Sequence, residues 1–345
     1  MRRWQMFALV ACLALLGTEH LYSQSKTSMW VPKLKGPAPG EIQILPVQGN
    51  VWVLIGAGGN ITVQAGEDGI LLVDTGTAAM SDKVLAAIAT ISKQTLRYIV
   101  DTTDSEDHTG GNAKIAATGE IIPFDLGDAA KIQNSFDTHR ASVISYLRVY
   151  DRMTGANGKS PARPEGDWPD NTYSSPEKRL YFNGEAVVIM HTPANTDGNS
   201  VVFFRKSDVI ASGDLLDLAE YPLIDLKAGG SIQGILDSLN RLLEVAVPSA
   251  YEQGGTLVIP GHGRIAGFAD VVYYRNMVSI IRDRIQDMIK RGMTLEQVKA
   301  ARPTLDYDAR YGNPGGKWTT DKFIEAAYQS LKSGAQAGKK QVSEN

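Results

Sequence analysis

The chain has 345 residues, of which 43% are hydrophobic and 21% charged, and its formal net charge is −3. This composition is ordinary for one large or two small globular domains. Because the charge is slightly negative and no long basic run is present, nucleic acid is excluded as an expected partner. The only cysteine is Cys12, so the remainder of the chain is expected to have no disulfide and no thiolate ligand.

The first segment, residues 1–23, has the pattern of an export signal. Arg2 and Arg3 precede an apolar stretch at 6–16, and a polar region follows it. We expect cleavage near residue 23 and a periplasmic or secreted protein. The apolar stretch is too short for a spanning helix, so no stable membrane span is predicted. The sequence around Cys12 resembles a lipobox, which leaves a lipid anchor as the alternative.

A lead-in segment rich in proline, glycine and lysine covers 24–41 and is predicted to be loose. Four short strands separated by glycine-containing turns are then predicted at 42–47, 51–55, 61–65 and 70–73. Further elements are predicted in the order helix, strand, helix, strand and long helix, at 80–92, 96–100, 111–117, 121–124 and 129–153.

Residues 154–177 are rich in glycine, proline, serine and aspartate, and are interpreted as a loop insertion. With Trp168 and Tyr173 it is a candidate lid, and the alternative is a surface insertion. Strands are predicted after it at 179–183, 186–191, 200–205, 208–212 and 256–259. Helices are predicted at 231–245, 267–292 and 319–333, with a shorter one at 294–301. This order predicts a layered α/β architecture.

The most informative motif lies at residues 102–112, which read Thr-Thr-Asp-Ser-Glu-Asp-His-Thr-Gly-Gly-Asn. It closely resembles the H-x-H-x-D-H-x-G-G-N signature of metallo-β-lactamase-fold hydrolases. Thr103 and Ser105 stand where that signature has its first two histidines. Asp107 and His108 match its final aspartate and histidine.

Four further segments resemble the same family in the same order. They are Leu-Leu-Val-Asp-Thr-Gly at 71–76, His-Thr-Pro-Ala-Asn-Thr-Asp-Gly at 191–198, Ser-Gly-Asp at 212–214 and Ile-Pro-Gly-His-Gly at 259–263. Five motifs in order identify residues 42–265 as a domain of this family. The resemblance implies a four-layer αββα sandwich, followed by a C-terminal helical extension at 266–345.

The resemblance also implies a two-metal site, of which this chain retains one half. The three histidine positions of the first metal are Thr103, Ser105 and Asn195. None of these is a good zinc ligand, so we expect the first site to be empty. The second metal's ligands correspond to Asp107, His108 and His262, all retained. Asp214 stands at the bridging aspartate position.

We therefore expect at most one metal, a Zn²⁺ ion, with Fe²⁺ or Mn²⁺ as alternatives because of the carboxylates. Asp107 and Asp214 are the candidate catalytic residues, and Asp214 is either a fourth ligand or the group that orients the attacking water. Asp74 is expected to support a ligand rather than bind metal. The implied reaction is hydrolysis of an ester, lactone, amide or phosphoester by metal-activated water.

Two alternatives stay open. The chain could be a catalytically inactive protein that binds a small ligand in the old cleft, with the retained residues hydrogen-bonded to one another. Alternatively, a Ca²⁺ or Mg²⁺ ion could bind oxygen ligands at the modified site. That idea depends on six acidic residues in this region, Asp101, Asp104, Glu106, Asp107, Asp197 and Asp214. Its competing interpretation is that Asp104 and Glu106 simply face solvent.

Overall fold

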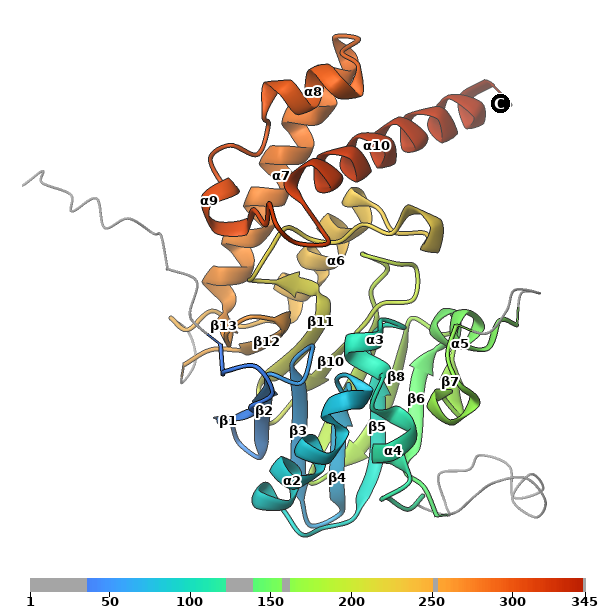
Figure 1. Ribbon diagram of the computed structural model, residues 1–345, viewed down its shortest axis with the longest axis vertical. Helices are drawn as coiled ribbons and strands as arrows, with labels where there is room; N and C mark the ends of the chain where they lie inside the picture. The colour runs from blue at the N-terminus through green and yellow to red at the C-terminus, as the bar shows by residue number, and fades with distance from the viewer. Residues whose placement is uncertain (1–35, 122–138, 157–161, 251–253, 344–345) are drawn as a thin grey trace, which may run out of the picture. The chain divides into compact units, whose positions relative to one another are not determined.

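A computed structural model describes residues 36–121, 139–156, 162–250 and 254–343, with side chains as far as residue 333. Two β-sheets pack face to face, and helices cover both outer faces (Figure 1). The predicted four-layer αββα sandwich with C-terminal helices is confirmed. The predicted export signal at 1–23 and most of the lead-in segment lie outside the described residues.

The first sheet has the strand order β1 to β7. Strands β1 to β4 form an antiparallel meander, whereas β4 to β7 pair in parallel. Parallel pairing places the carboxyl ends of β4 and β5 at the same edge of the sheet. The strands are β1 (Gln43–Gln48), β2 (Val51–Ile55), β3 (Ile61–Gly66), β4 (Gly69–Val73), β5 (Leu96–Asp101), β6 (Ser142–Tyr146) and β7 (Asn171–Tyr173).

The second sheet has the order β13-β12-β11-β10-β9-β8. Only the β11–β12 pair is parallel among its described strands, and its register is irregular between Gly213 and Asp217. Such a bulge redirects side chains, here around Asp214. The strands are β8 (Glu177–Phe182), β9 (Glu185–His191), β10 (Ser200–Phe204), β11 (Val209–Asp217), β12 (Leu257–His262) and β13 (Ala266–Gly267).

Alternation along the strands builds three cores. Leu71 and Val73 point into the core between the sheets, whereas Leu72 faces the outer layer formed by helices α2 (Ser81–Ile91) and α4 (Asn112–Ala116). On the other outer face, Ile210 packs toward α6 (Ile232–Val245). Central strands such as β3, β4 and β10 are thus packed on both faces, which gives their ends a rigid frame.

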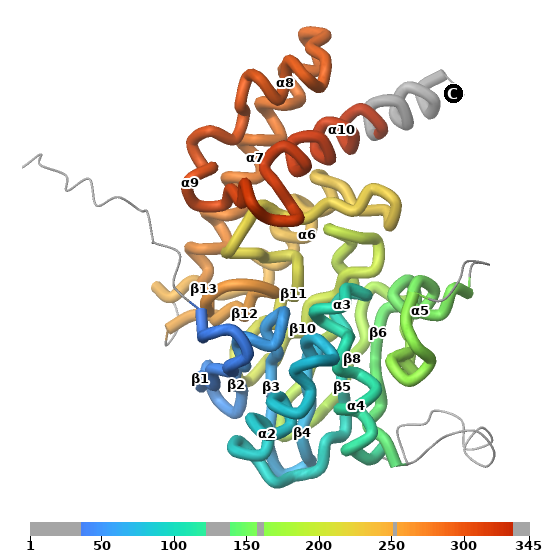
Figure 2. Tube along the Cα trace, viewed as in Figure 1, coloured from blue at the N-terminus to red at the C-terminus, as the bar shows by residue number. Residues whose placement is uncertain are grey.

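The C-terminal helices are α7 (Phe268–Lys290), α8 (Leu295–Ala301), α9 (Asp308–Tyr311) and α10 (Thr320–Ser343). Figure 2 shows these orange and red segments gathered beside α6, and the third core joins them to the second sheet. Tyr221 and Phe323 stack at 4.7 Å between ring centroids, tying the loop after β11 to α10. In the described part of the chain, no helix is both long and apolar enough to cross a bilayer.

The prediction of one long helix over 129–153 is wrong. Within the described residues, 142–146 form strand β6, and helix α5 begins only at Leu147 and ends at Thr154. Ser-Val-Ile-Ser-Tyr is a β-branched stretch that pairs with β5 and β7, and that pairing decides its structure. Residues 122–124 of the predicted strand and 129–138 of the predicted helix lie outside the described residues.

The predicted loop at 154–177 is also only partly a loop. Its described residues include a short 3-10 helix η3 (Glu165–Asp167) and strand β7, which completes the first sheet. Tyr173 is buried, and its hydroxyl lies 2.7 Å from Ser200 Oγ. The Trp168 indole donates to Arg163 O within the same segment. Tyr173 therefore belongs to the core and is not part of a lid.

Candidate metal centre

The retained motif residues come from the ends of four strands. Asp74 follows β4, and the 102–108 segment follows β5 and leads into the one-turn helix α3 (Glu106–Thr109). Asp214 lies on β11, and His262 is the last residue of β12. Parallel pairing within each sheet brings these ends to one edge of the sandwich.

Three of the predicted ligands lie close enough to bind one ion. The ligand atoms of Asp107, His108 and His262 are all within 4.8 Å of one another. His262 Nε2 lies 3.1 Å from Asp107 Oδ2, and Asp214 Oδ1 lies 2.9 Å from His108 Nε2 and 3.7 Å from His262 Nε2. The structure therefore brings together all four retained residues of the predicted second site.

The orientation of His108 is set by Asp74. The Nδ1 atom of the fully buried imidazole lies 2.7 Å from Asp74 Oδ2. Asp74 also accepts hydrogen bonds from the Thr102 amide and hydroxyl, each at 2.8 Å. Its φ of 64° is unusual for a non-glycine residue, and such strain is found where surrounding contacts require it. Asp74 thus contacts the outer side of the ring, and Nε2 faces the cluster.

One atom tests whether a metal fits this donor set. His108 Nε2 is buried and has no aligned hydrogen bond, although Asp214 Oδ1 lies 2.9 Å away. Buried polar atoms without a partner are rare and call for a missing partner. Gly59 leaves the room, because a Cβ there would lie 2.7 Å from this nitrogen. A buried imidazole nitrogen beside a second imidazole and two carboxylates suits a divalent metal ion.

The neighbouring carboxylates raise the pKa values of both histidines. Burial alone would lower the pKa of His108, but the charges of Asp214 and Asp74 outweigh burial and raise that pKa well above its usual value. Burial alone would also lower the pKa of His262, yet its contact with Asp107 and the charges of neighbouring aspartates raise that pKa to about 9. The surrounding carboxylates therefore favour positive charge at both imidazoles.

The histidines in turn lower the pKa values of the Asp107 and Asp214 carboxyl groups. Burial would raise the pKa of Asp107, but His262, His108 and Ser105 hold it well below its usual range. Burial would also raise the pKa of Asp214, and His108 outweighs that effect. The side chains of Asp107 and Asp214 are 36% and 15% exposed, so both carboxylates reach the solvent side of the cluster.

The first-metal positions have different surroundings. Ser105 Oγ donates to Asp107 Oδ1 at 2.7 Å, so this residue holds a carboxylate of the other half. Asn195 is buried, and its Nδ2 donates to Leu223 O at 2.9 Å. Thr103 is buried and carries no charge. This half of the site contains hydroxyl and amide groups in place of three imidazoles.

The surplus acidic residues do not form one cation site. Asp104 and Asp197 both bind the guanidinium of Arg152, at 2.8 and 2.5 Å. Asp101 accepts from Asn112, and burial raises its pKa. The interpretation that Asp104 faces solvent is wrong, since its side chain is only 23% exposed, whereas Glu106 is 74% exposed.

Sequence reasoning missed Arg152. It lies 48 residues after Asp104, on a helix whose start was mispredicted, and it matches no motif position. The available signal was the local excess of carboxylates, which requires a counter-charge. His191, the first residue of the 191–198 motif, stacks on Tyr146 and contacts Asp197 O at 2.8 Å, consistent with a structural role.

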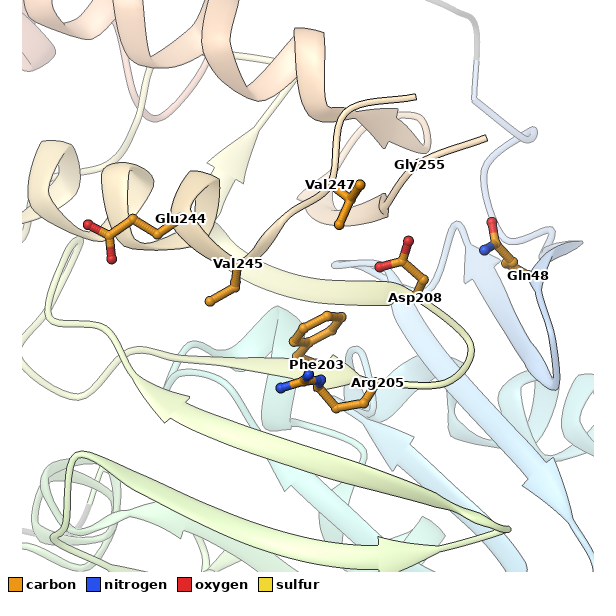
Figure 3. A pocket seen from close by; sticks show the side chains of 8 residues that line it. All are labelled: Gln48, Phe203, Arg205, Asp208, Glu244, Val245, Val247 and Gly255. Atoms are coloured by element: carbon orange, nitrogen blue, oxygen red, sulfur yellow. The ribbon is translucent and has the colours of Figure 1, made fainter. Parts of the chain in front are cut away.

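A pocket of about 550 Å³ lies at the other end of β11 (Figure 3). Its lining includes Phe203, Arg205, Asp208 and Glu244. Asp208 directly precedes β11 and Asp214 is six residues further, which corresponds to about 20 Å of strand at ~3.3 Å per residue. This pocket is therefore separate from the metal-ligand cluster.

Comparisons with known proteins agree with this fold. The family model of the metallo-beta-lactamase superfamily matches residues 54–262. No curated protein matches the chain in sequence. A solved structure of the DIM-1 metallo-beta-lactamase is 19% identical, covers 71% of this chain and 99% of its own, and has a TM-score of 0.50.

Two solved structures of a sec-alkylsulfatase are similar over more of the chain. The stereoselective inverting sec-alkylsulfatase Pisa1 from Pseudomonas sp. is 16% identical with a TM-score of 0.59, and a double mutant of PisA1 is 15% identical with a TM-score of 0.58. Each comparison covers 84% of this chain and 50% of the sulfatase chain, so the chain spans half the length of these neighbours. At such identities the likeness shows the fold.

Proposed function

This chain belongs to the metallo-beta-lactamase superfamily, and from that premise we propose that it is an exported hydrolase that works with one metal ion. The observation that carries the proposal is the convergence of the ligand atoms of Asp107, His108 and His262, which all lie within 4.8 Å of one another. Export is proposed from the pattern of residues 1–23 alone.

Asp107, His108 and His262 would hold the ion, and zinc suits this mixture of imidazole and carboxylate. A bound ion there supplies Lewis acidity and a hydroxide near neutral pH. The protein's own contribution is orientation. Asp74 fixes the ring of His108, while Ser105 and His262 contact the two oxygens of the Asp107 carboxylate.

Asp214 is the group best placed to handle a proton. Its Oδ1 lies 2.9 Å from His108 Nε2, and its side chain is 15% exposed, so it contacts both the buried ligand and the solvent side. A carboxylate held in its charged form can accept a proton from water or orient it. Esters, lactones, amides and phosphoesters are the substrate classes to screen. Sulfate esters join them because two neighbours in structure are sec-alkylsulfatases.

Elemental analysis tests the proposal. Protein purified without chelator should contain about one equivalent of transition metal, and His262→Ala should contain none. Thr103→Ala is the matched control, because it alters a buried motif residue of the other half and should keep the metal. Absence of metal from the unaltered protein, even after zinc is added, would overturn the proposal.

A second candidate function has its own supporting observation. The ion pairs His262–Asp107 and His108–Asp214 already balance the cluster without metal, as a metal-free binding protein would require. Replacing both histidines by glutamine distinguishes the two. Loss of hydrolysis with an unchanged circular dichroism spectrum supports the enzyme, and ligand binding that survives the replacement supports the binding protein.

A further inference from the structure

Arg152 lies between two loops and bonds to both. From helix α5, its Nε and Nη2 atoms donate to Asp104 Oδ1 at 3.0 and 2.8 Å. Its Nη1 donates to Asp197 Oδ1 at 2.5 Å, and Nη2 also donates to Thr196 Oγ1 at 3.1 Å. One planar guanidinium thus satisfies three acceptors on two segments that are about ninety residues apart in sequence.

The two loops are those that carry the three replaced positions. Asp104 lies between Thr103 and Ser105, while Thr196 and Asp197 directly follow Asn195. A first metal in this family would be bound by both loops and would join them. We propose that the Arg152 guanidinium takes the place of the first metal ion as the cation that joins these loops, and so acts as the positioning residue for the retained half of the site.

The Arg152 side chain is closely packed by its neighbours. A Cβ at Gly198 would lie 2.5 Å from Nη2 of Arg152, so the 195–198 loop passes close to the guanidinium and a side chain there would displace it. The Arg152 side chain is only 21% exposed, and its partner Asp104 is 23% exposed. Arg163 adds a second bond to the same loop, since its Nη2 donates to Asp104 O at 3.1 Å. This arrangement is more specific than a surface ion pair.

The connection to the metal ligands runs through Ser105. Arg152 holds Asp104, the next residue is Ser105, and its hydroxyl donates to Asp107 Oδ1 at 2.7 Å. The Ser105 carbonyl also accepts from the amides of His108 and Thr109, which closes the turn that carries both ligands. Loosening the 103–107 loop therefore displaces Asp107 and weakens its hold on a metal.

This inference concerns the same site as the proposed function but does not require that a metal binds. Its first readout is hydrogen exchange of metal-free protein. Arg152→Met keeps the length of the side chain and removes its charge and donors. We expect at least ~10-fold faster exchange of amides in both loops, including those of His108 and Asp197, which donate to Ser105 O and Ala228 O.

The matched control is Arg148→Met. Arg148 is one turn earlier on α5 and 54% exposed, and its nearest approach to Asp197 is 4.0 Å. This variant should leave exchange in both loops unchanged. Arg152→Lys keeps the charge but loses the planar fork, so it should restore only part of the protection. If Arg152→Met leaves both loops protected, or if Arg148→Met loosens them equally, the inference is wrong.

The second readout is zinc affinity by competition with a chromophoric chelator. Loss of a group that positions a ligand is expected to weaken zinc about 10- to 100-fold in Arg152→Met, with no change in Arg148→Met. If no variant binds zinc, the proposed function fails while exchange still decides this inference. If Arg152→Met does not fold, Asp104→Asn and Asp197→Asn serve instead. Each should loosen the two loops together, and loosening of its own loop alone would contradict a joint cross-link.

Discussion

The two halves of this centre meet the same physical problem with different cations. Around His108 and His262, partly buried carboxylates face two imidazoles that, as proposed, bind a divalent ion. Around Arg152, the carboxylates of Asp104 and Asp197 face a guanidinium that keeps its charge at any ordinary pH. The first half can bind a metal ion as its cation, whereas the second carries a permanent cation in Arg152.

The difference teaches which part of a two-metal site can be lost without losing the fold. The loops on the Arg152 side are bridged by a side chain, so they need no ion to stay together. The ring of His108 is fully buried. Asp74 and Asp214 each contact one of its nitrogens, and Gly59 packs against it without a side chain. Removing that ring takes the nearest cationic partner away from both carboxylates.

Replacement of His108 should therefore have the largest effect on stability. His108→Ala removes the imidazole that faces the carboxylates of Asp74 and Asp214 and leaves a cavity, which costs about 3–5 kcal/mol of unfolding free energy. Urea denaturation of the metal-free protein measures this. Thr103→Ser, a buried change in the other half, is the control and should cost about 1 kcal/mol or less. Equal costs for the two variants would remove the distinction between the halves.

The pH dependence of stability sharpens the same comparison. The pKa of His262 rises from 6.5 to about 9 on folding, so its stabilising effect is complete below about pH 6.5 and is lost as the pH rises through 9. Metal-free protein should lose on the order of 1–3 kcal/mol over that interval, measured by urea denaturation. His262→Gln should lose less, and zinc-loaded protein should show no such loss because its ligands carry no proton. A flat profile in the unaltered metal-free protein would contradict the assigned charges.

Asp74 is predicted to act on metal affinity more than on the fold. In Asp74→Asn the amide cannot hold the His108 tautomer as a carboxylate does, and zinc affinity should fall about 10- to 100-fold. Competition titration measures the change. Asp170→Asn is a suitable comparison, because this partly buried aspartate accepts from Ser142 and Val143 away from the ligands. An equal loss in both variants would show that Asp74 has no special connection to the metal.

The smallest expected effect is at the boundary of the two halves. Ser105→Ala removes the hydrogen bond to Asp107 Oδ1 and should weaken zinc by about 1 kcal/mol, or roughly 5-fold. Ser105→Thr can keep the hydroxyl and should bind zinc like the unaltered protein. A loss larger than that of Asp74→Asn would mean that Ser105 binds the metal directly.

Much of this centre could be predicted from the sequence because its ligands lie in short motifs. The Asp-His pair follows β5, His262 ends β12 and Asp214 lies within β11, and strands such as 51–55 have a clear β-branched pattern. A short motif can be recognised from the sequence alone, and the family resemblance then assigned each motif residue to a metal position. Asp74 was predicted to support a ligand for the same reason, and it contacts His108 Nδ1 at 2.7 Å.

The remainder depended on contacts between distant segments. Strand β6 at 142–146 forms because it pairs between β5 and β7, and two β-branched residues within five give only a weak local signal for a strand. Arg152 is one of many arginines until the fold places it against Asp104 and Asp197. The acidic surplus of the motif was visible, but its partner was not, because charge pairing over 45 residues is fixed only by tertiary structure.

The most direct test of the two-halves account is an anomalous difference map from crystals of the protein soaked in zinc. The account predicts one peak, within bonding distance of Asp107, His108 and His262, and no peak beside Thr103, Ser105 and Asn195. A second peak among those three residues, or a single peak there instead, would contradict it.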